Sequence, residues 1–116
     1  MPQRFIPLPV VFFANSAGRE PVRAWLKKLE KDDRREIGAD VLAVQKGWPL
    51  GLPLCRSLGN GLWEVRSVLP SRRIARVIFA IDEGAIVLLN GFIKKTQKTP
   101  AGEIELALKR LKEMSA

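Results

Sequence analysis

The chain has 116 residues and is 47% hydrophobic, which fits one compact domain with an apolar core. Its net charge is +8, while a single cysteine and the absence of histidine exclude an internal disulfide and argue against a zinc site. No apolar run approaches the roughly 20 residues of a membrane span. The start of the chain does not have the pattern of a signal peptide, so we expect a cytoplasmic protein without a metal or other cofactor.

The first part of the chain predicts a short strand followed by a helix. Residues 9–15 form an apolar run that begins at Pro9, and proline is tolerated at the start of a strand. Pro21 suits the first turn of a helix, which we expect to end near Lys31. Its buried stripe consists of four residues at helical spacing, Val22, Trp25, Leu26 and Leu29.

A second helix is predicted directly after the first. Asp33 and Glu36 have the spacing of a capping box at its start, and Gly47 marks its end. One face of this helix carries Ile37, Val41, Val44 and Trp48. The short link between the helices predicts a helical hairpin packed on the sheet. We expect Trp25 and Trp48 to anchor the core rather than to stack on nucleic-acid bases.

Two further segments flank the predicted sheet. Residues 49–61 are rich in Gly and Pro and predict a loop, in which Cys55 is a small half-buried side chain. A cysteine nucleophile would need a nearby histidine, and the chain has none. The last helix is predicted to start with Thr99 as N-cap and Pro100 as first residue. Its buried stripe comprises Ile104, Ala107, Leu108 and Leu111.

Residues 62–100 organise the rest of the chain. Three apolar runs rich in Val, Ile, Phe and Trp are separated by short turn signals, which predicts a three-stranded antiparallel meander. The dipeptide Glu83-Gly84 suits a two-residue hairpin, and this register pairs Arg76 with Gly91. A three-residue loop at 70–72 would pair Arg66 with Arg76. The resulting fold class is α+β, with an antiparallel sheet, an N-terminal strand and helical hairpin, and a C-terminal helix.

This register assigns each side chain of the meander to one of two faces. The core face, which the helices should cover, carries Trp63, Val65, Ala75, Val77, Phe79, Ile81, Ile86, Leu88 and Phe92. The opposite face carries Glu64, Arg66, Arg76, Ile78, Leu89, Gly91 and Ile93, with Lys95 added if the last strand stays extended. A slip of one residue would exchange the two faces.

The positive charge is concentrated on the predicted sheet. Lys and Arg exceed Asp and Glu by five within residues 55–99, by three within 1–54, and not at all within 100–116. Such a localised excess suggests a polyanionic partner, and the alternative is a soluble surface that happens to be basic. Arg66 opposite Arg76 destabilises a sheet unless an anion or Glu64 compensates, and Gly91 beside Arg76 would leave room for a ligand. Two interpretations remain open, an Arg–Glu–Arg cluster on a solvated face or a phosphate-binding cleft.

Several of these segments resemble a known family. The strings LWEVR at 62–66 and GFIKKTQKTP at 91–100, together with Arg76 and the helix after 103, resemble the phage-derived branch of the RelE/HigB toxin superfamily. The resemblance implies a type II toxin–antitoxin toxin, an endoribonuclease that cuts messenger RNA on the ribosome. It also implies a helix-turn-helix antitoxin encoded nearby as a partner. It leaves the oligomeric state and the codon preference undetermined.

The resemblance also suggests which residues take part in RNA cleavage. Arg66, Arg76, Lys94 and Lys95 match the basic positions such toxins use, whereas the Tyr or His that several members use as acid or base is absent. We expect the arginines to stabilise charge on the phosphorane and a lysine to supply a proton. Glu64 is either a base or a salt-bridge partner. Further RNA contacts are predicted for three basic residues of the neighbouring turns, Arg72, Arg73 and Lys98.

Two other functions remain open for the same scaffold. One is a nucleic-acid-binding module without catalytic activity, and the other is a structural phage protein. Transcript cleavage in a translation reaction distinguishes the endonuclease from the first, and the basic sheet makes the second less favoured.

Overall fold

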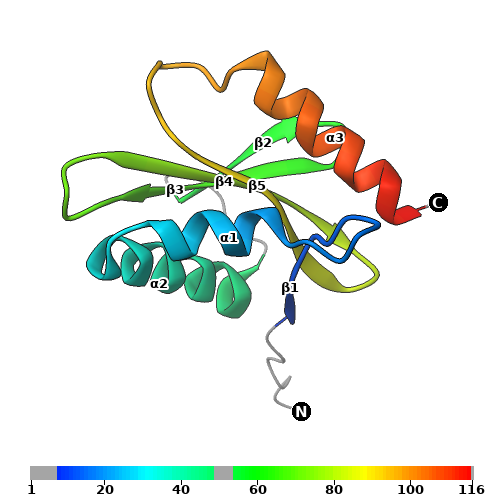
Figure 1. Cartoon of the computed structure of the whole chain (residues 1–116), viewed down its shortest axis with the longest axis horizontal. Helices are drawn as coiled ribbons and strands as arrows, with labels where there is room; N and C mark the ends of the chain where they lie inside the picture. Colours follow the sequence, from blue (N-terminus) through cyan, green and yellow to red (C-terminus); the bar gives the residue numbers. More distant parts are fainter. Residues whose placement is uncertain (1–7, 49–53, 116) are drawn as a thin grey trace, which may run out of the picture.

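The computed structural model of the chain describes residues 8–48 and 54–115, with side-chain surroundings up to residue 114. Within these ranges a five-stranded sheet is sandwiched between helices (Figure 1). The elements, in chain order, are β1 (Val10–Phe12), α1 (Pro21–Lys28), α2 (Lys31–Gly47), β2 (Cys55–Gly59), β3 (Leu62–Val68), β4 (Ile74–Asp82), β5 (Ala85–Ile93) and α3 (Ala101–Ser115). The predicted α+β class is confirmed.

The sheet is mixed, which corrects the prediction of an antiparallel one. Its strand order is β1-β5-β4-β3-β2, and neighbours run antiparallel except for β1, which pairs parallel to β5. The parallel pairing is possible because two helices and three strands separate β1 from β5 along the chain. The prediction of a loop over 49–61 is also wrong in part, since Cys55–Gly59 form the edge strand β2. Residues 49–53 lie outside the described ranges.

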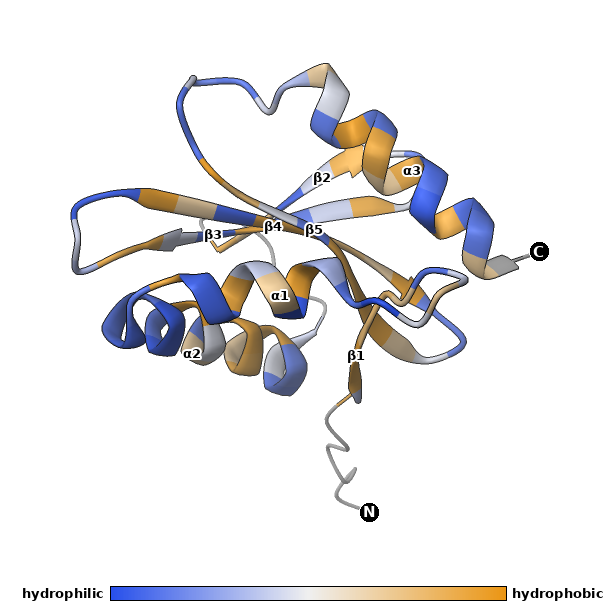
Figure 2. Ribbon diagram, viewed as in Figure 1, coloured by the Kyte–Doolittle hydropathy of each residue, from blue (hydrophilic) through white to orange (hydrophobic). Residues whose placement is uncertain are grey.

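Each face of the sheet has its own apolar core. Helices α1 and α2 cover one face, and α3 crosses the other (Figure 1). Figure 2 shows hydrophobic and hydrophilic residues interleaved along these helices, as expected of helices that bury a single stripe. The predicted stripe of α3 is confirmed, because Ile104, Ala107, Leu108 and Leu111 pack together with the apolar side chains of its face. No helix in the described ranges is long and apolar enough to cross a membrane.

The tryptophans anchor the core beneath α1 and α2, as predicted. Trp25 and Trp48 pack against the buried cluster that includes Val65 and Phe79. The ring of Trp48 meets Trp63 edge-on at 4.9 Å between centroids, a favourable aromatic geometry. Cys55 is fully buried in the same cluster, and burial raises the pKa of its thiol to about 11. It is therefore a packing residue and not a reactive one.

A bulge in β5 limits the predicted register. The pairing of Ala80 with Val87 is as predicted, and Glu83 and Gly84 have the positive φ values of a two-residue hairpin. The register shifts between Phe79 and Ile78, however, so that Arg76 lies opposite Phe92 and not opposite Gly91. A β-bulge inserts one residue into a strand and moves the residues beyond it to opposite faces.

The bulge corrects three face assignments. Phe92 packs with the α3 cluster, whereas Ile93 packs with the α1–α2 cluster. Gly91 lies against the ring of Trp25 on the α1 face, opposite to the face that carries Arg76, so Gly91 does not provide the predicted room for a ligand beside Arg76. The remaining assignments of the core face, from Trp63 to Leu88, are correct.

The end of α1 and the start of α2 also differ from the prediction. Helix α1 ends at Lys28, and α2 begins at Lys31 after Glu30, so Asp33 lies inside the first turn instead of capping it. Asp33 is 1% exposed, and its carboxylate accepts hydrogen bonds from the Ser71 backbone N–H at 3.2 Å and from Arg73 at 3.3 Å. This carboxylate therefore ties the β3–β4 turn to α2.

The Asp33 contact predicts a pH-dependent contribution to stability. Hydrogen bonding by Ser71 is the largest influence and lowers the pKa of Asp33, although burial opposes it. A carboxyl group whose pKa is lowered by folding stabilises the protein above its unfolded pKa of about 3.9 and loses that contribution as pH falls through the folded value. The variant Asp33→Asn should melt below the wild type at pH 7, and the difference should shrink below about pH 4. Melting curves of both proteins at pH 7 and from about pH 5 down to about pH 2 test this, and a difference that does not shrink below about pH 4 would contradict it.

The contact between Gly91 and Trp25 predicts a steric effect. A Cβ added at Gly91 would lie 2.5 Å from Cε3 and Cζ3 of Trp25. We expect Gly91→Ala to lower the free energy of unfolding by about 1–3 kcal/mol, as overpacking does. Gly38→Ala is the matched control, because its Cβ meets nothing within 4 Å and alanine favours the α2 helix by about 0.5–1 kcal/mol. Denaturant titration measures both, and equal effects would refute the steric argument.

Candidate functional site

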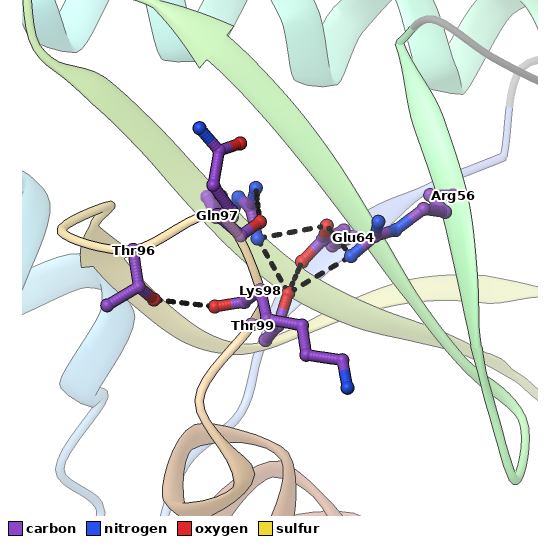
Figure 3. Close-up of polar contacts among 7 residues, drawn as sticks. Arg56, Glu64, Thr96, Gln97, Lys98 and Thr99 are labelled. Atoms are coloured by element: carbon purple, nitrogen blue, oxygen red, sulfur yellow. Dashed lines mark hydrogen bonds and ion pairs between the residues drawn. The ribbon is translucent and has the colours of Figure 1, made fainter.

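The sheet brings the predicted acidic and basic side chains together on its α3 face. Arg66 on β3 pairs directly opposite Arg76 on β4, as predicted, and Glu64 pairs with Arg56 on β2. After β5 the chain crosses this face before it enters α3, and Thr99 reaches the neighbourhood of Glu64 and Arg56 (Figure 3). The site thus combines three adjacent strands with the segment 94–100.

Glu64 and Arg76 form a buried ion pair that closes on Thr99. Both residues are 4% exposed, and Glu64 Oε1 lies 3.5 Å from Arg76 Nη1. The Thr99 hydroxyl donates to Glu64 Oε2 at 2.6 Å and accepts from Arg76 Nη1 at 2.8 Å. This hydroxyl was predicted to cap α3, but it serves the ion pair instead. We call the three residues the buried lock.

Arg56 completes the ring around the Glu64 carboxylate. Its Nη2 lies 3.1 Å from Glu64 Oε1 and 3.4 Å from the Thr99 hydroxyl (Figure 3). Both oxygens of Glu64 are therefore occupied, which is the arrangement of a salt-bridge partner. The sequence did not identify Arg56, because its segment was interpreted as a loop. Had residues 55–59 been assigned to a strand, the pairing of Arg56 opposite Glu64 would have indicated this contact.

The segment 94–100 is fixed to the sheet by its backbone. Arg76 Nη2 donates to the carbonyl oxygen of Gln97 at 3.1 Å. The backbone N–H of Lys94 donates to the carbonyl oxygen of Ile74 at 2.7 Å, and the Thr96 hydroxyl donates to that of Lys98 at 2.7 Å (Figure 3). Arg76 thus positions the segment that carries Lys94, Lys95 and Lys98.

A cleft lies beside the buried lock. It has a volume of about 440 Å³ and is lined by Leu54, Arg56, Glu64, Arg66, Arg76, Lys94 and Gln97. A second cavity of about 500 Å³ shares Lys94 and Gln97 with it. The second one is lined by Arg72, Arg73, Ile74, Lys94, Lys95, Thr96 and Gln97. Together they form one basic groove along the segment 94–97.

The predicted site residues differ in how their charges are used. Glu64 and Arg76 neutralise each other in the buried lock, and Arg73 pairs with Asp33 at 3.3 Å. Within the described residues, Arg66, Lys94 and Lys95 form no ion pair. Their charges therefore remain available to an anion.

The remaining predicted RNA contacts lie around this groove. Arg72 lines its second cavity with a positive φ of 70°, while Lys98 is exposed on the segment 94–100 and lines neither cavity. Arg66 is exposed at the mouth of the first cavity. Groups of three or more His, Cys, Asp or Glu side chains that could hold a metal ion do not occur among the described residues. The groove suits a phosphate or another oxyanion, which arginine binds with paired N–H groups.

One comparison with known proteins identifies a relationship. The family model described as "Phage derived protein Gp49-like (DUF891)" matches residues 24–112, a range that contains the buried lock and every residue of the basic groove. The family is associated with the toxins of toxin–antitoxin systems. No curated protein matches the chain.

The contrast between the two facing arginines predicts opposite effects of mutation. Arg76→Ala would leave Glu64 buried without one of its cations, and breaking a buried ion pair in this way lowers stability by about 3–5 kcal/mol. Arg66→Ala removes an exposed cation with no ion pair, so we expect a change within about 0.5 kcal/mol. Denaturant unfolding of the two variants measures both. Equal stabilities would show that the Glu64–Arg76 pair contributes nothing net.

Proposed function

The chain belongs to the Gp49-like family of phage-derived proteins, and we propose that it is the toxin of a type II toxin–antitoxin system. In this proposal it is a member of the RelE/HigB superfamily that cuts messenger RNA on the ribosome in the cytoplasm, without a metal ion. Its partner in the resting state is a helix-turn-helix antitoxin encoded nearby.

One observation supports the proposal most directly. Arg66 and Lys94, which form no ion pair among the described residues, line a cleft of about 440 Å³ together with Glu64 and Arg76 of the buried lock. Catalysis of phosphate-ester cleavage gains most from cations fixed in place before the charge develops. Cations beside a hydrogen-bonded ion pair support that requirement.

The proposed mechanism assigns each residue a role at the scissile phosphate. Cleavage needs a group that activates the 2′-hydroxyl, cations that stabilise the phosphorane, and an acid that protonates the departing 5′-oxygen. Arg66 stabilises the phosphorane, and Arg76 acts by positioning Gln97 and the segment behind it. Lys94 or Lys95 supplies the proton. The 2′-hydroxyl is activated either by Glu64 or by a group of the ribosome.

The state of Glu64 also favours a second candidate, a binding module without cleavage activity. Glu64 is the only carboxylate among the described residues that line the first cavity, and Arg56, Arg76 and Thr99 occupy its oxygens. A base must be free to accept a proton within hydrogen-bond reach of the substrate. If no other group replaces it, the basic groove would bind RNA without cutting it.

The test is the loss of activity in a folded protein. Arg66→Ala, expressed without the antitoxin, should relieve growth arrest, and the purified variant should cut programmed messenger RNA about 100-fold more slowly, as on removal of a fixed transition-state donor. Primer extension on messenger RNA from a translation reaction measures the cuts. The wild type should give discrete cuts that Arg66→Ala lacks.

The matched control is Lys46→Ala, which removes an exposed cation in the last turn of α2, outside the lining of the groove. It should cut like the wild type. Equal cutting by Arg66→Ala and wild type would reject the assignment of the cleft. RNA binding by the wild type without any cut would favour the binding module.

A further inference from the structure

A second basic cleft lies away from the groove and is lined by residues of the β1–α1 segment and α1 and by Arg110 of α3. Its volume is about 670 Å³, and it shares no lining residue with the two cavities of the groove. Four cationic side chains line it, Arg19, Arg23, Lys27 and Arg110. They come from two parts of the chain that are far apart in sequence and that only the fold brings together.

Arg110 is held in place by neutral groups. Its Nη1 donates to the carbonyl oxygen of Leu89 at 2.7 Å and approaches Asn90 Oδ1 at 3.4 Å. The guanidinium carbon lies 5.6 Å from the ring centroid of Phe13, within the range of a cation–π contact. Within the described residues it forms no ion pair, and burial lowers its pKa. Arg110 is thus a partly desolvated cation held by neutral hydrogen-bond acceptors, while the nearby carboxylates of Glu103 and Glu113 partly offset the effect of burial on its pKa.

The rest of the cleft adds further unneutralised charge. Glu20 is the only carboxylate in the described lining, and it pairs with Arg23 at 3.3 Å. Arg19 and Lys27 are exposed and form no ion pair among the described residues. Four cations and one carboxylate therefore line the cleft, and Glu103 and Glu113 act on Arg110 from outside this lining. The lining keeps an excess of positive charge, and an anion seated there would offset the mutual repulsion of the cations and the partial burial of Arg110.

We propose that this cleft binds a backbone phosphate of RNA, at a position separate from the cleaved bond. Among the described residues the lining offers cations and the amide of Asn15 but no aromatic side chain on which a base could stack, so it suits contact with the backbone and not recognition of a base. The inference rests on the proposed function only in taking the nucleic acid to be RNA. Inorganic phosphate and free nucleotides share this chemistry and are distinguished by competition.

The test compares two double charge reversals. Arg19→Glu with Lys27→Glu changes the cleft, and Lys109→Glu with Lys112→Glu makes the same change of net charge at exposed positions of α3 outside it. The probe is a labelled single-stranded 2′-O-methyl RNA, which cannot be cut through its 2′-oxygen. Fluorescence anisotropy over a range of salt concentrations gives the affinity, and melting curves confirm that both variants are folded.

The cleft variant should bind at least about tenfold more weakly at low salt than the α3 variant. Its plot of log affinity against log salt should also be shallower by about 1.4, because each lost phosphate contact on a single strand reduces the slope by about 0.7. Equal affinities and slopes for the two variants would overturn the inference. Inorganic phosphate or a nucleoside triphosphate is then added at a concentration too low to act through ionic strength. If it displaces RNA from the wild type but not from the cleft variant, the cleft is assigned to that smaller anion instead.

These outcomes are independent of cleavage. A wild-type protein that cuts messenger RNA, with two variants that bind alike, would leave the proposed function intact and remove the second site. A wild type that never cuts, with a cleft variant that binds more weakly than the α3 variant, would remove the endonuclease and keep the site.

Discussion

The arrangement of the site depends on the burial of one ion pair. Glu64 and Arg76 lie on adjacent strands, beneath a segment that must leave β5 and reach α3. An unpaired charge at this depth would be costly, so the carboxylate, the guanidinium and the Thr99 hydroxyl constrain one another. Because Arg76 also binds the carbonyl oxygen of Gln97, the same interaction fixes the path of 94–100. The buried contacts of Arg76 with Glu64, Thr99 and Gln97 therefore help to determine where Lys94 lies in the groove.

The fold was predictable where local patterns determine it. Alternation along β3 and β4, and the residues Glu83-Gly84, set the hairpins and the main core face correctly. Most of the failures have a common cause, since they concern strands whose pairing depends on segments far away in the sequence. The bulge in β5, the parallel pairing of β1 and the edge strand β2 all depend on neighbours that periodicity does not specify. Asp33 similarly matched a capping pattern, but its tertiary contact with Ser71 and Arg73 prevailed.

The sequence predicted most of the charged residues that form the candidate site, but not which of their charges are buried and paired. Arg66 and Arg76 were correctly placed opposite each other, and Glu64 beside them. Sequence alone could not distinguish the arginine that is buried and paired from the one that is exposed. That difference arises because the segment 94–100 and β2 cover one end of the face, and Thr99 and Arg56 reach over Glu64. From the sequence, Thr99 was expected at the N-cap of α3 and Arg56 in a loop.

The basic side chains behind the net charge of +8 fall into two groups. Some form ion pairs that stabilise the fold, and others form no ion pair among the described residues. Arg76 and Arg73 belong to the first group, because each pairs with a buried carboxylate. Arg66, Lys94 and Lys95 belong to the second, and they border a groove whose backbone the first group holds in place. Free cations repel one another and lower stability unless an anion joins them. Cations that folding already holds near one another would bind an anion without a further cost for bringing them together, which supports the proposed function.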